Sequence, residues 1–93
     1  MNNETPPQNR WDEVIDVYFQ AVDARAAGQR DKAVRLALHL AHLLEQIDPK
    51  CEAMWGMAGR SLIADLDGDY DEAIRYSRME LAYTLSLHDA LPI

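Results

Sequence analysis

The stretch WGMAGRSLIADLDGDYDEA, residues 55–73, decides the fold class of this 93-residue chain. Its first half is rich in apolar side chains up to Leu66, as expected of a packed helix. Asp67-Gly68 ends that helix, because glycine readily takes the left-handed conformation that follows a helix C-terminus. Asp69 and Glu72 then have the spacing of a capping box, which marks the start of another helix. The stretch therefore predicts two helices joined by a short turn.

Both of these helices extend beyond the quoted stretch. Upstream, Asp48-Pro49 has the pattern of a helix start, with aspartate as the N-cap and proline in the first helical position. Downstream, the inner face of the last helix is expected to consist of Ala73, Ile74, Tyr76, Met79 and Leu81. These limits predict a helical hairpin over residues 49–82.

A first hairpin is predicted over residues 9–47. Its opening helix begins at the N-cap Asn9 and ends at Gly28. Between them an apolar stripe recurs at three- and four-residue spacing, as on one face of a helix; it consists of Trp11, Val14, Ile15, Tyr18 and Val22. Residues 1–8 are polar and contain two prolines, so they are expected to be disordered.

The second helix of this hairpin, to about Ile47, is apolar around most of its circumference. Its polar side chains form one narrow stripe: Lys32, Arg35, His39, His42 and Gln46. A helix with so wide an apolar arc needs neighbours on two sides. Short connections between helices imply antiparallel neighbours. The expected fold is therefore all-α, with two antiparallel helix-turn-helix hairpins stacked on each other, and a generic four-helix bundle is the alternative.

The last residues, YTLSLHDALPI at 83–93, look like the translation of a widely used short-read sequencing adapter in one reading frame. We interpret them as an artefactual tail without evolved function, so His88 and Asp89 are not candidate site residues. The alternative is an amphipathic C-terminal turn whose leucines pack on the core: Leu85, Leu87 and Leu91. On the first interpretation, the chain is a fragment of a longer repeat protein.

The two hairpins echo each other at their turns. Gly28 is followed by Ala33, and 40 residues later Gly68 is followed by Ala73, which indicates an internal repeat. The second hairpin resembles a tetratricopeptide repeat. Its matching positions are Trp55 as the aromatic of the first helix, Gly59 and Ala73 as the small residues where the helices cross, and Gly68-Asp69-Tyr70 as the turn.

The resemblance covers residues 11–82 and is weaker in the first hairpin. Ala21 and Ala33 match the two small positions there, but Val17 replaces the aromatic residue and the second helix is about one turn longer. The segment from Trp55 to Gly68 is also two residues longer than the family pattern. The resemblance implies an α-solenoid fragment, and these departures affect its expected superhelical geometry more than the stacking of hairpins.

In the family that the chain resembles, the first helix of each hairpin lines a concave groove. Carried over to this chain, the resemblance implies that a partner contacts Ile15, Tyr18, Val22 and Arg25 from the first hairpin and Gly56, Arg60, Ile63 and Ala64 from the second. The two arginines are expected to bind a carboxylate of the partner. The alternative is that Ile15, Tyr18 and Val22 belong to the core.

Composition excludes several other classes of function. The net charge is −7 and the nine Lys and Arg residues are scattered, which argues against nucleic acid as a partner. Cys51 is the only cysteine, so no internal disulfide can form and a reducing compartment is expected. No apolar run is long enough to span a membrane, and residues 1–10 lack the apolar core of a signal peptide. We expect a cytoplasmic protein.

The candidate chemical sites are weak. His39 and His42 share a helix face, but no further metal ligand completes a set there. Asp65, Asp67, Asp69 and Asp71 alternate as in a calcium loop; however, Tyr70 and Tyr76 stand where that loop requires glycine and glutamate. Cys51 has no local histidine to activate it. We therefore expect no metal, no cofactor and no catalytic residue.

The sequence favours a protein–protein interaction module that binds a peptide or a helix in a groove. The alternative is an accessory helical region of a larger multidomain enzyme or regulator. Because two hairpins form only one repeat interface, the chain is also expected to be marginally stable or to self-associate through its uncapped C-terminal end.

Overall fold

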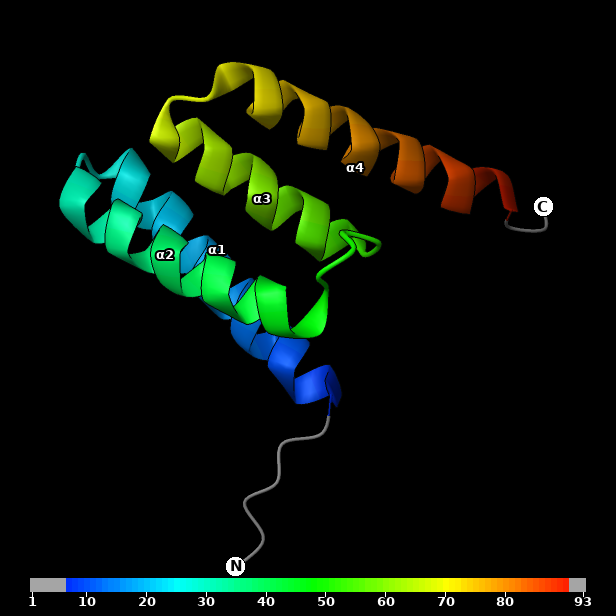
Figure 1. Ribbon diagram of the computed structural model, residues 1–93, viewed down its shortest axis with the longest axis horizontal. Helices are drawn as coiled ribbons and strands as arrows, with labels where there is room; N and C mark the ends of the chain where they lie inside the picture. Colours follow the sequence, from blue (N-terminus) through cyan, green and yellow to red (C-terminus); the bar gives the residue numbers. More distant parts are fainter. Residues whose placement is uncertain (1–6, 91–93) are drawn as a thin grey trace, which may run out of the picture.

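The computed structural model describes residues 7–90, and this part of the chain consists of four helices without a strand (Figure 1). They are α1 (Pro7–Ala26), α2 (Arg30–Ile47), α3 (Met54–Asp67) and α4 (Tyr70–Ala90). The expected all-α fold is confirmed. Helices α1 and α2 pack as one hairpin, and α3 and α4 pack as the other.

The two hairpin turns have the same backbone geometry. Gly28 and Gly68 have φ angles of 78° and 82°, the left-handed region in which glycine avoids the steric penalty of a side chain. In both turns the next residue donates its N–H to a carbonyl of the last helical turn, from Gln29 to Ala24 and from Asp69 to Ala64, each at 2.9 Å. The predicted glycine stops are therefore confirmed.

The start of α1 lies earlier than predicted. Pro7 and Gln8 are helical, whereas they were expected to belong to a disordered N-terminus with Asn9 as the cap. Proline suits a helix start, because its fixed φ is helical and its missing N–H would have no helical acceptor there. The rest of that predicted disordered segment, residues 1–6, lies outside the described residues.

The predicted start of α3 at Asp48-Pro49 is wrong. The helix begins at Met54, after a loop in which Cys51 has a φ of 55°. The Asp48 carboxylate accepts the backbone N–H groups of Glu52 at 2.9 Å and Ala53 at 3.2 Å. Asp48 therefore caps a turn of the loop, six residues before the first residue of the helix, and it is buried there, with 7% of its surface exposed.

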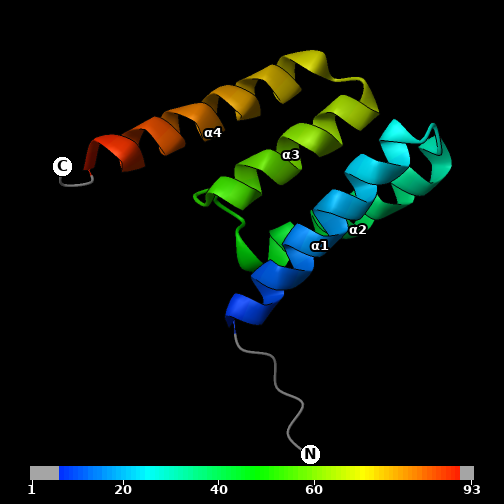
Figure 2. The ribbon, with the colours of Figure 1, turned by 180° about the vertical axis from the view of Figure 1, so that it is seen from behind.

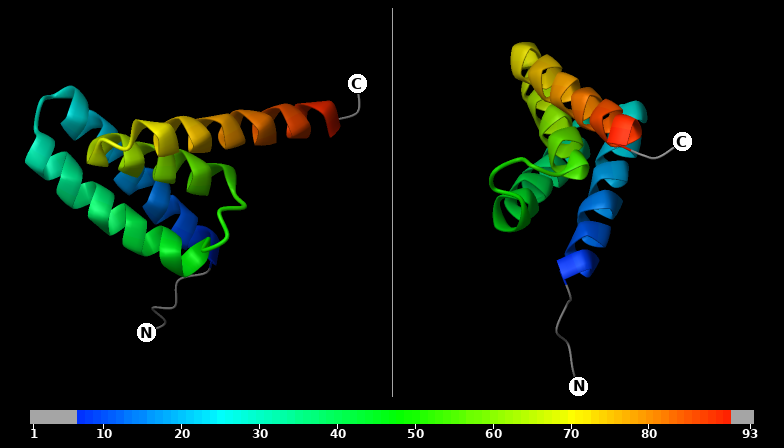
Figure 3. Two further views of the ribbon diagram at one scale, coloured as in Figure 1. Left: turned by 45° about the horizontal axis from the view of Figure 1, so that its top comes forward. Right: turned by 90° about the vertical axis from the view of Figure 1, so that its right-hand side faces the viewer.

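Helix α3 is the centre of the molecule. It packs against α1 and α2 on one side and against α4 on the other, as Figures 1 and 2 show from opposite faces. Helix α2 has its two expected neighbours, α1 and α3. The extents of 45 × 44 × 22 Å describe a flat stack, and the turned views in Figure 3 show α4 at its outer edge.

The core is built by α1, α2 and α3. Val14 and Leu40 are fully buried, and so are the two predicted small residues Ala21 and Ala33. The repeat pattern implied that Gly59 faces Ala73. In the structure it does not. A Cβ at Gly59 would lie 2.7 Å from Leu44 Cδ1, so its missing side chain allows α3 to approach α2.

Helix α4 contributes little to the core. Ala73 is its one buried apolar residue among the described side chains, whereas Ile74 and Leu81 are 51% and 59% exposed. The expectation that these two residues belong to the inner face is therefore wrong. The reason is that α4 packs on α3 alone, so that one narrow strip of its surface is covered.

The helix continues without a break through residue 82 into the segment interpreted as a tail. Leu85 and Leu87 are about half exposed, at 55% and 50%. These two side chains are not buried in the core, where the alternative for this segment placed them. Leu91 lies outside the described residues.

Candidate binding groove

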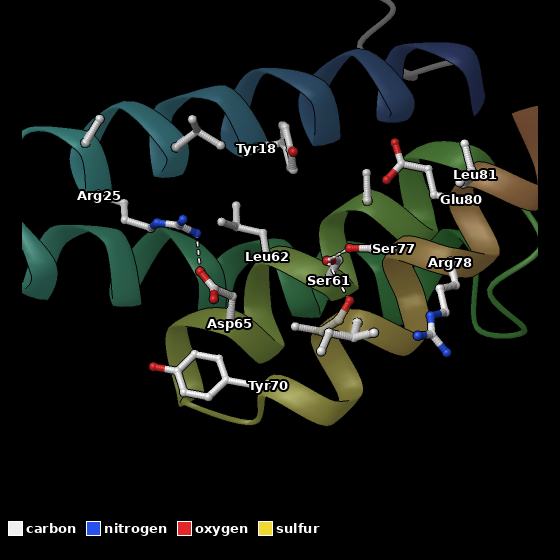
Figure 4. Close-up of a pocket in the computed structure, with 15 residues that line it drawn as sticks. Tyr18, Arg25, Ser61, Leu62, Asp65, Tyr70, Ser77, Arg78, Glu80 and Leu81 are labelled. Atoms are coloured by element: carbon white, nitrogen blue, oxygen red, sulfur yellow. Dashed lines mark hydrogen bonds and ion pairs between the residues drawn. The ribbon is translucent and has the colours of Figure 1, made fainter.

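A groove of about 820 Å³ lies between α1, α3 and α4 (Figure 4). Tyr18, Val22 and Arg25 form its α1 wall. The floor is α3, where Leu62 is buried. The α4 wall carries the exposed apolar side chains Ile74 and Leu81 together with Ser77, Arg78 and Glu80. Three helices thus converge on one hollow that has apolar side chains on its walls and its floor.

Aromatic contacts hold the α1 wall against α3. The ring of Tyr18 packs edge-on against Trp55, with centroids 5.5 Å apart, and Phe19 packs against the same indole at 5.7 Å. Edge-to-face pairs at such distances are favourable because the positive ring edge meets the negative ring face. Trp55, the aromatic position of the repeat pattern, therefore joins the two hairpins at the edge of the groove.

The phenol of Tyr18 has a pKa that is raised above its ordinary value. Burial is the largest cause, the negative charge of Glu80 is the second, and the positive charge of Arg25 acts in the opposite direction. Both charged groups thus act on the phenol in the same groove. Figure 4 shows Glu80 pointing toward α1, whereas Arg78 points away from it.

Arg25 forms an ion pair with Asp65 that joins α1 to α3 across the groove (Figure 4). The side chains are 52% and 31% exposed. Arg25 was predicted to bind a carboxylate of the partner, but in this structure its carboxylate comes from the same chain. A partner would have to displace Asp65 to use it.

Two serines join the floor to the α4 wall. The Ser61 hydroxyl lies 3.1 Å from the carbonyl oxygen of Ala73 and 2.8 Å from the Ser77 hydroxyl. Small side chains at this crossing let α4 approach α3 closely. Beyond that point, the apolar side chains of α4 extend over the groove.

A second, smaller cleft of about 450 Å³ lies on the other side of α3, between α2 and α4. It contains the predicted residues Arg60, Ile63 and Ala64, whereas Tyr18, Val22 and Arg25 line the first groove. Ile15 and Gly56 line neither. The prediction of a single surface formed by all eight residues is therefore wrong.

The predicted residues are separated because of the rotation of α3 about its own axis. At about 100° per residue, positions 58, 61, 62 and 65 share one face, and positions 60, 63, 64 and 67 lie roughly opposite. The family resemblance implied that a partner contacts the face with positions 60, 63 and 64. The structure instead places α1 over the face with positions 58, 61, 62 and 65.

Arg60 and Gly56 support the loop between α2 and α3. Arg60 Nη2 donates to the carbonyl oxygen of Asp48 at 2.6 Å, and its Nη1 donates to the carbonyl oxygen of Gly56 at 3.3 Å. A Cβ at Gly56 would lie 1.8 Å from Asp48 Oδ2, so a side chain there would displace the Asp48 carboxylate. Gly56 is buried, and Arg60 lines the second cleft while its guanidinium is bonded to this loop.

The remaining candidate sites have structural partners. His39 lies 3.6 Å from Glu13 of α1, and His42 lies 3.1 Å from Gln46. Asp69 accepts the backbone N–H of Glu72 at 3.2 Å, which is one half of the predicted capping box. The Glu72 side chain accepts from Arg75 instead, at 3.0 Å, so the reciprocal half is not formed.

Within residues 7–90, no three His, Cys, Asp or Glu side chains are placed so that they could hold a metal ion. Over the same range, no helix combines the length and the apolar character needed to cross a bilayer.

The residues that sequence reasoning missed are those of the α4 wall. Ile74, Arg78 and Leu81 are spaced i, i+4 and i+7, which places them on one helix face. That spacing was visible in the sequence. The two apolar members were assigned to the core because a periodic pattern identifies a face without identifying what covers it.

Comparisons of the chain with known protein families, with curated proteins and with solved structures found no match.

Proposed function

We propose that this chain is a protein–protein interaction module of the tetratricopeptide-like kind and that the groove between α1, α3 and α4 receives an amphipathic helix of a partner protein. The observation that carries the proposal is the exposure of Ile74 and Leu81, at 51% and 59%, along a groove whose floor is buried Leu62. The proposal assigns no reaction to the chain. Its single free cysteine, Cys51, suits a reducing compartment such as the cytoplasm.

A helix suits the groove better than an extended peptide does. All three bounding elements are helices, whose backbone N–H and C=O groups are paired within each helix. An extended peptide would therefore leave its own backbone groups without partners against the apolar walls, which is unfavourable. A helix satisfies its own backbone and can present apolar side chains at i, i+3, i+4 and i+7.

The charge around the groove also suits a partner of mixed charge. Two arginines and two acidic residues line it, Arg25 and Arg78 with Asp65 and Glu80, whereas the whole chain has a net charge of −7. The groove is therefore locally neutral on a strongly acidic protein. An acidic partner is therefore repelled less strongly at the groove than at the rest of the surface.

The proposal can be tested with a displayed library of amphipathic helical peptides selected against the intact chain. Binding should weaken about tenfold or more in Ile74→Glu and in Leu81→Glu, since burial of one such side chain contributes roughly 1.5–3 kcal/mol. The matched control is Leu38→Glu on α2. Leu38 is 66% exposed and lies outside the groove, so this variant should bind as the wild type does.

Circular dichroism would confirm that all three variants keep their helical content. A failure to select any peptide would overturn the proposal, and so would selected peptides that bind Leu81→Glu and Leu38→Glu equally well.

A further inference from the structure

The α4 wall of the groove has a cation along one side of its apolar stripe. Arg78 follows Ile74 by one helical turn and precedes Leu81 by three residues, so the three side chains lie on one face. Arg78 is exposed. Within the described residues its guanidinium has no hydrogen-bond or ion-pair partner, whereas Arg25 is paired with Asp65 and Arg75 with Glu72.

Arg78 and Glu80, the two charged groove side chains without an ion-pair partner among the described residues, lie on opposite sides of this stripe. Glu80 points toward α1, and Arg78 points away from α1 at the outer edge of α4 (Figure 4). A docked helix covers the stripe between them. One flank of that helix therefore passes Arg78, and the other flank passes Glu80 and the Tyr18 phenol.

We infer that the groove selects an amphipathic helix with a carboxylate on the flank that passes Arg78. This inference rests on the proposed function and specifies the chemistry of the partner. The carboxylate pairs with the guanidinium, which can donate two parallel hydrogen bonds to it. On the opposite flank Glu80 disfavours a carboxylate. The two charges together fix the rotation of the helix about its own axis, which apolar contacts alone leave loosely determined.

The experiment uses two synthetic peptides that differ at one position. The first is a groove-binding amphipathic peptide with glutamate on one flank of its apolar stripe, and the second has lysine at that position. Against the wild type, the glutamate peptide should bind about fivefold more tightly, the difference expected of an exposed ion pair worth up to about 1 kcal/mol. Against Arg78→Glu the preference should invert. The difference should also shrink in high salt.

Arg35→Glu on α2 is the control, because Arg35 is exposed, lies outside the groove and undergoes the same change of charge. It should leave the preference for glutamate intact. Two outcomes would overturn the inference: equal binding of both peptides to the wild type, or a preference that survives Arg78→Glu. With either outcome, tight peptide binding that still depends on Leu81 would continue to support the proposed function. Absence of all peptide binding would remove both.

Discussion

At the scale of single residues, the loop between α2 and α3 depends on the absence of a side chain at Gly56. The Asp48 carboxylate occupies the space that a Cβ at Gly56 would take, at 1.8 Å from Oδ2. There it accepts the N–H groups of Glu52 and Ala53. A buried carboxylate needs such donors, because a buried charge without them is strongly unfavourable.

Gly56→Ala should therefore lower the free energy of unfolding by about 1 kcal/mol. The displaced carboxylate loses hydrogen bonds worth about 1–3 kcal/mol, and the higher helix propensity of alanine offsets about 1 kcal/mol of this loss. In an Asp48→Ala background the obstruction is gone, so the same substitution should stabilise the protein by about 1 kcal/mol. Urea unfolding of the four variants measures both effects, and equal effects in the two backgrounds would contradict the interpretation.

Tyr18 gives the protein an expected loss of stability at alkaline pH. Its pKa is raised in the folded state above the ordinary value of 10.0, chiefly by burial and then by Glu80. A raised pKa means that the folded state prefers the neutral phenol. The stabilisation is fully present below the unfolded pKa and is lost as the pH rises through the folded pKa.

Unfolding measured at pH values from neutral to well above 10 should show this loss in the wild type and less of it in Tyr18→Phe. In Glu80→Gln, the ultraviolet absorbance of the phenolate should report a Tyr18 pKa closer to its ordinary value. An unchanged titration would show that Glu80 does not act on the phenol.

At the scale of elements, two arginines join neighbouring parts of the fold and should differ in their effects. Arg25 and Asp65 link α1 to α3 with half-exposed side chains, 52% and 31%, and exposed pairs contribute only about 0–1 kcal/mol. Arg60 is 18% exposed and donates to the Asp48 carbonyl at 2.6 Å. Its loss leaves the Asp48 carbonyl with only the Cys51 N–H at 3.1 Å, and it also removes the cation that lies 3.6 Å from the buried Asp48 carboxylate.

We therefore expect Arg25→Ala to change the free energy of unfolding by less than about 1 kcal/mol. Arg60→Ala should lower it by about 1–3 kcal/mol. Denaturant unfolding of both variants provides the comparison. If Arg25→Ala proved the more damaging of the two, the ion pair across the groove would be a structural element rather than an exchangeable contact.

Also at the element scale, local chemistry predicted some helix ends and misplaced others. The stops at Gly28 and Gly68 were predictable because glycine takes the left-handed conformation after a helix without a steric penalty, and this preference depends on its own backbone alone. The start of α3 was not. Asp48-Pro49 has the composition of a helix start, but the Asp48 carboxylate accepts the N–H groups of Glu52 and Ala53 within a loop, and the Arg60 guanidinium lies 3.6 Å from it.

At the scale of the whole molecule, α4 lies outside the main core. Apart from Ala73, its described apolar side chains are at least partly exposed, and it packs on α3 alone. The segment after residue 82 is similarly exposed, with Leu85 at 55% and Leu87 at 50%. Little of the stability of the fold should depend on that segment.

Truncation after Ala82 should therefore change the free energy of unfolding by less than about 1 kcal/mol, as is usual for changes away from buried features. Thermal unfolding followed by circular dichroism measures it. In contrast, Ala73→Asp should be clearly destabilising, because Ala73 is 9% exposed and a carboxylate there is buried against α3. Loss of cooperative unfolding on truncation would show that the segment belongs to the folded unit.

The sequence by itself determined the all-α class, the two glycine turns and the polar stripe of α2, because these depend on backbone preferences and on periodicity within one helix. It did not determine the buried face of α1, which consists of Val14, Val17, Ala21 and Ala24, since only Val14 of these belongs to the predicted stripe. Only the tertiary structure decided which face of α3 meets α1 and which face of α4 stays open. A helix pattern identifies an apolar stripe, but the rotation of each helix against its neighbours is set by packing, as at Gly59 against Leu44. For that reason seven of the eight predicted contact residues line one of two hollows on opposite sides of α3 or support its loop, Ile15 does neither, and the groove has Ile74, Arg78 and Leu81 on its α4 wall.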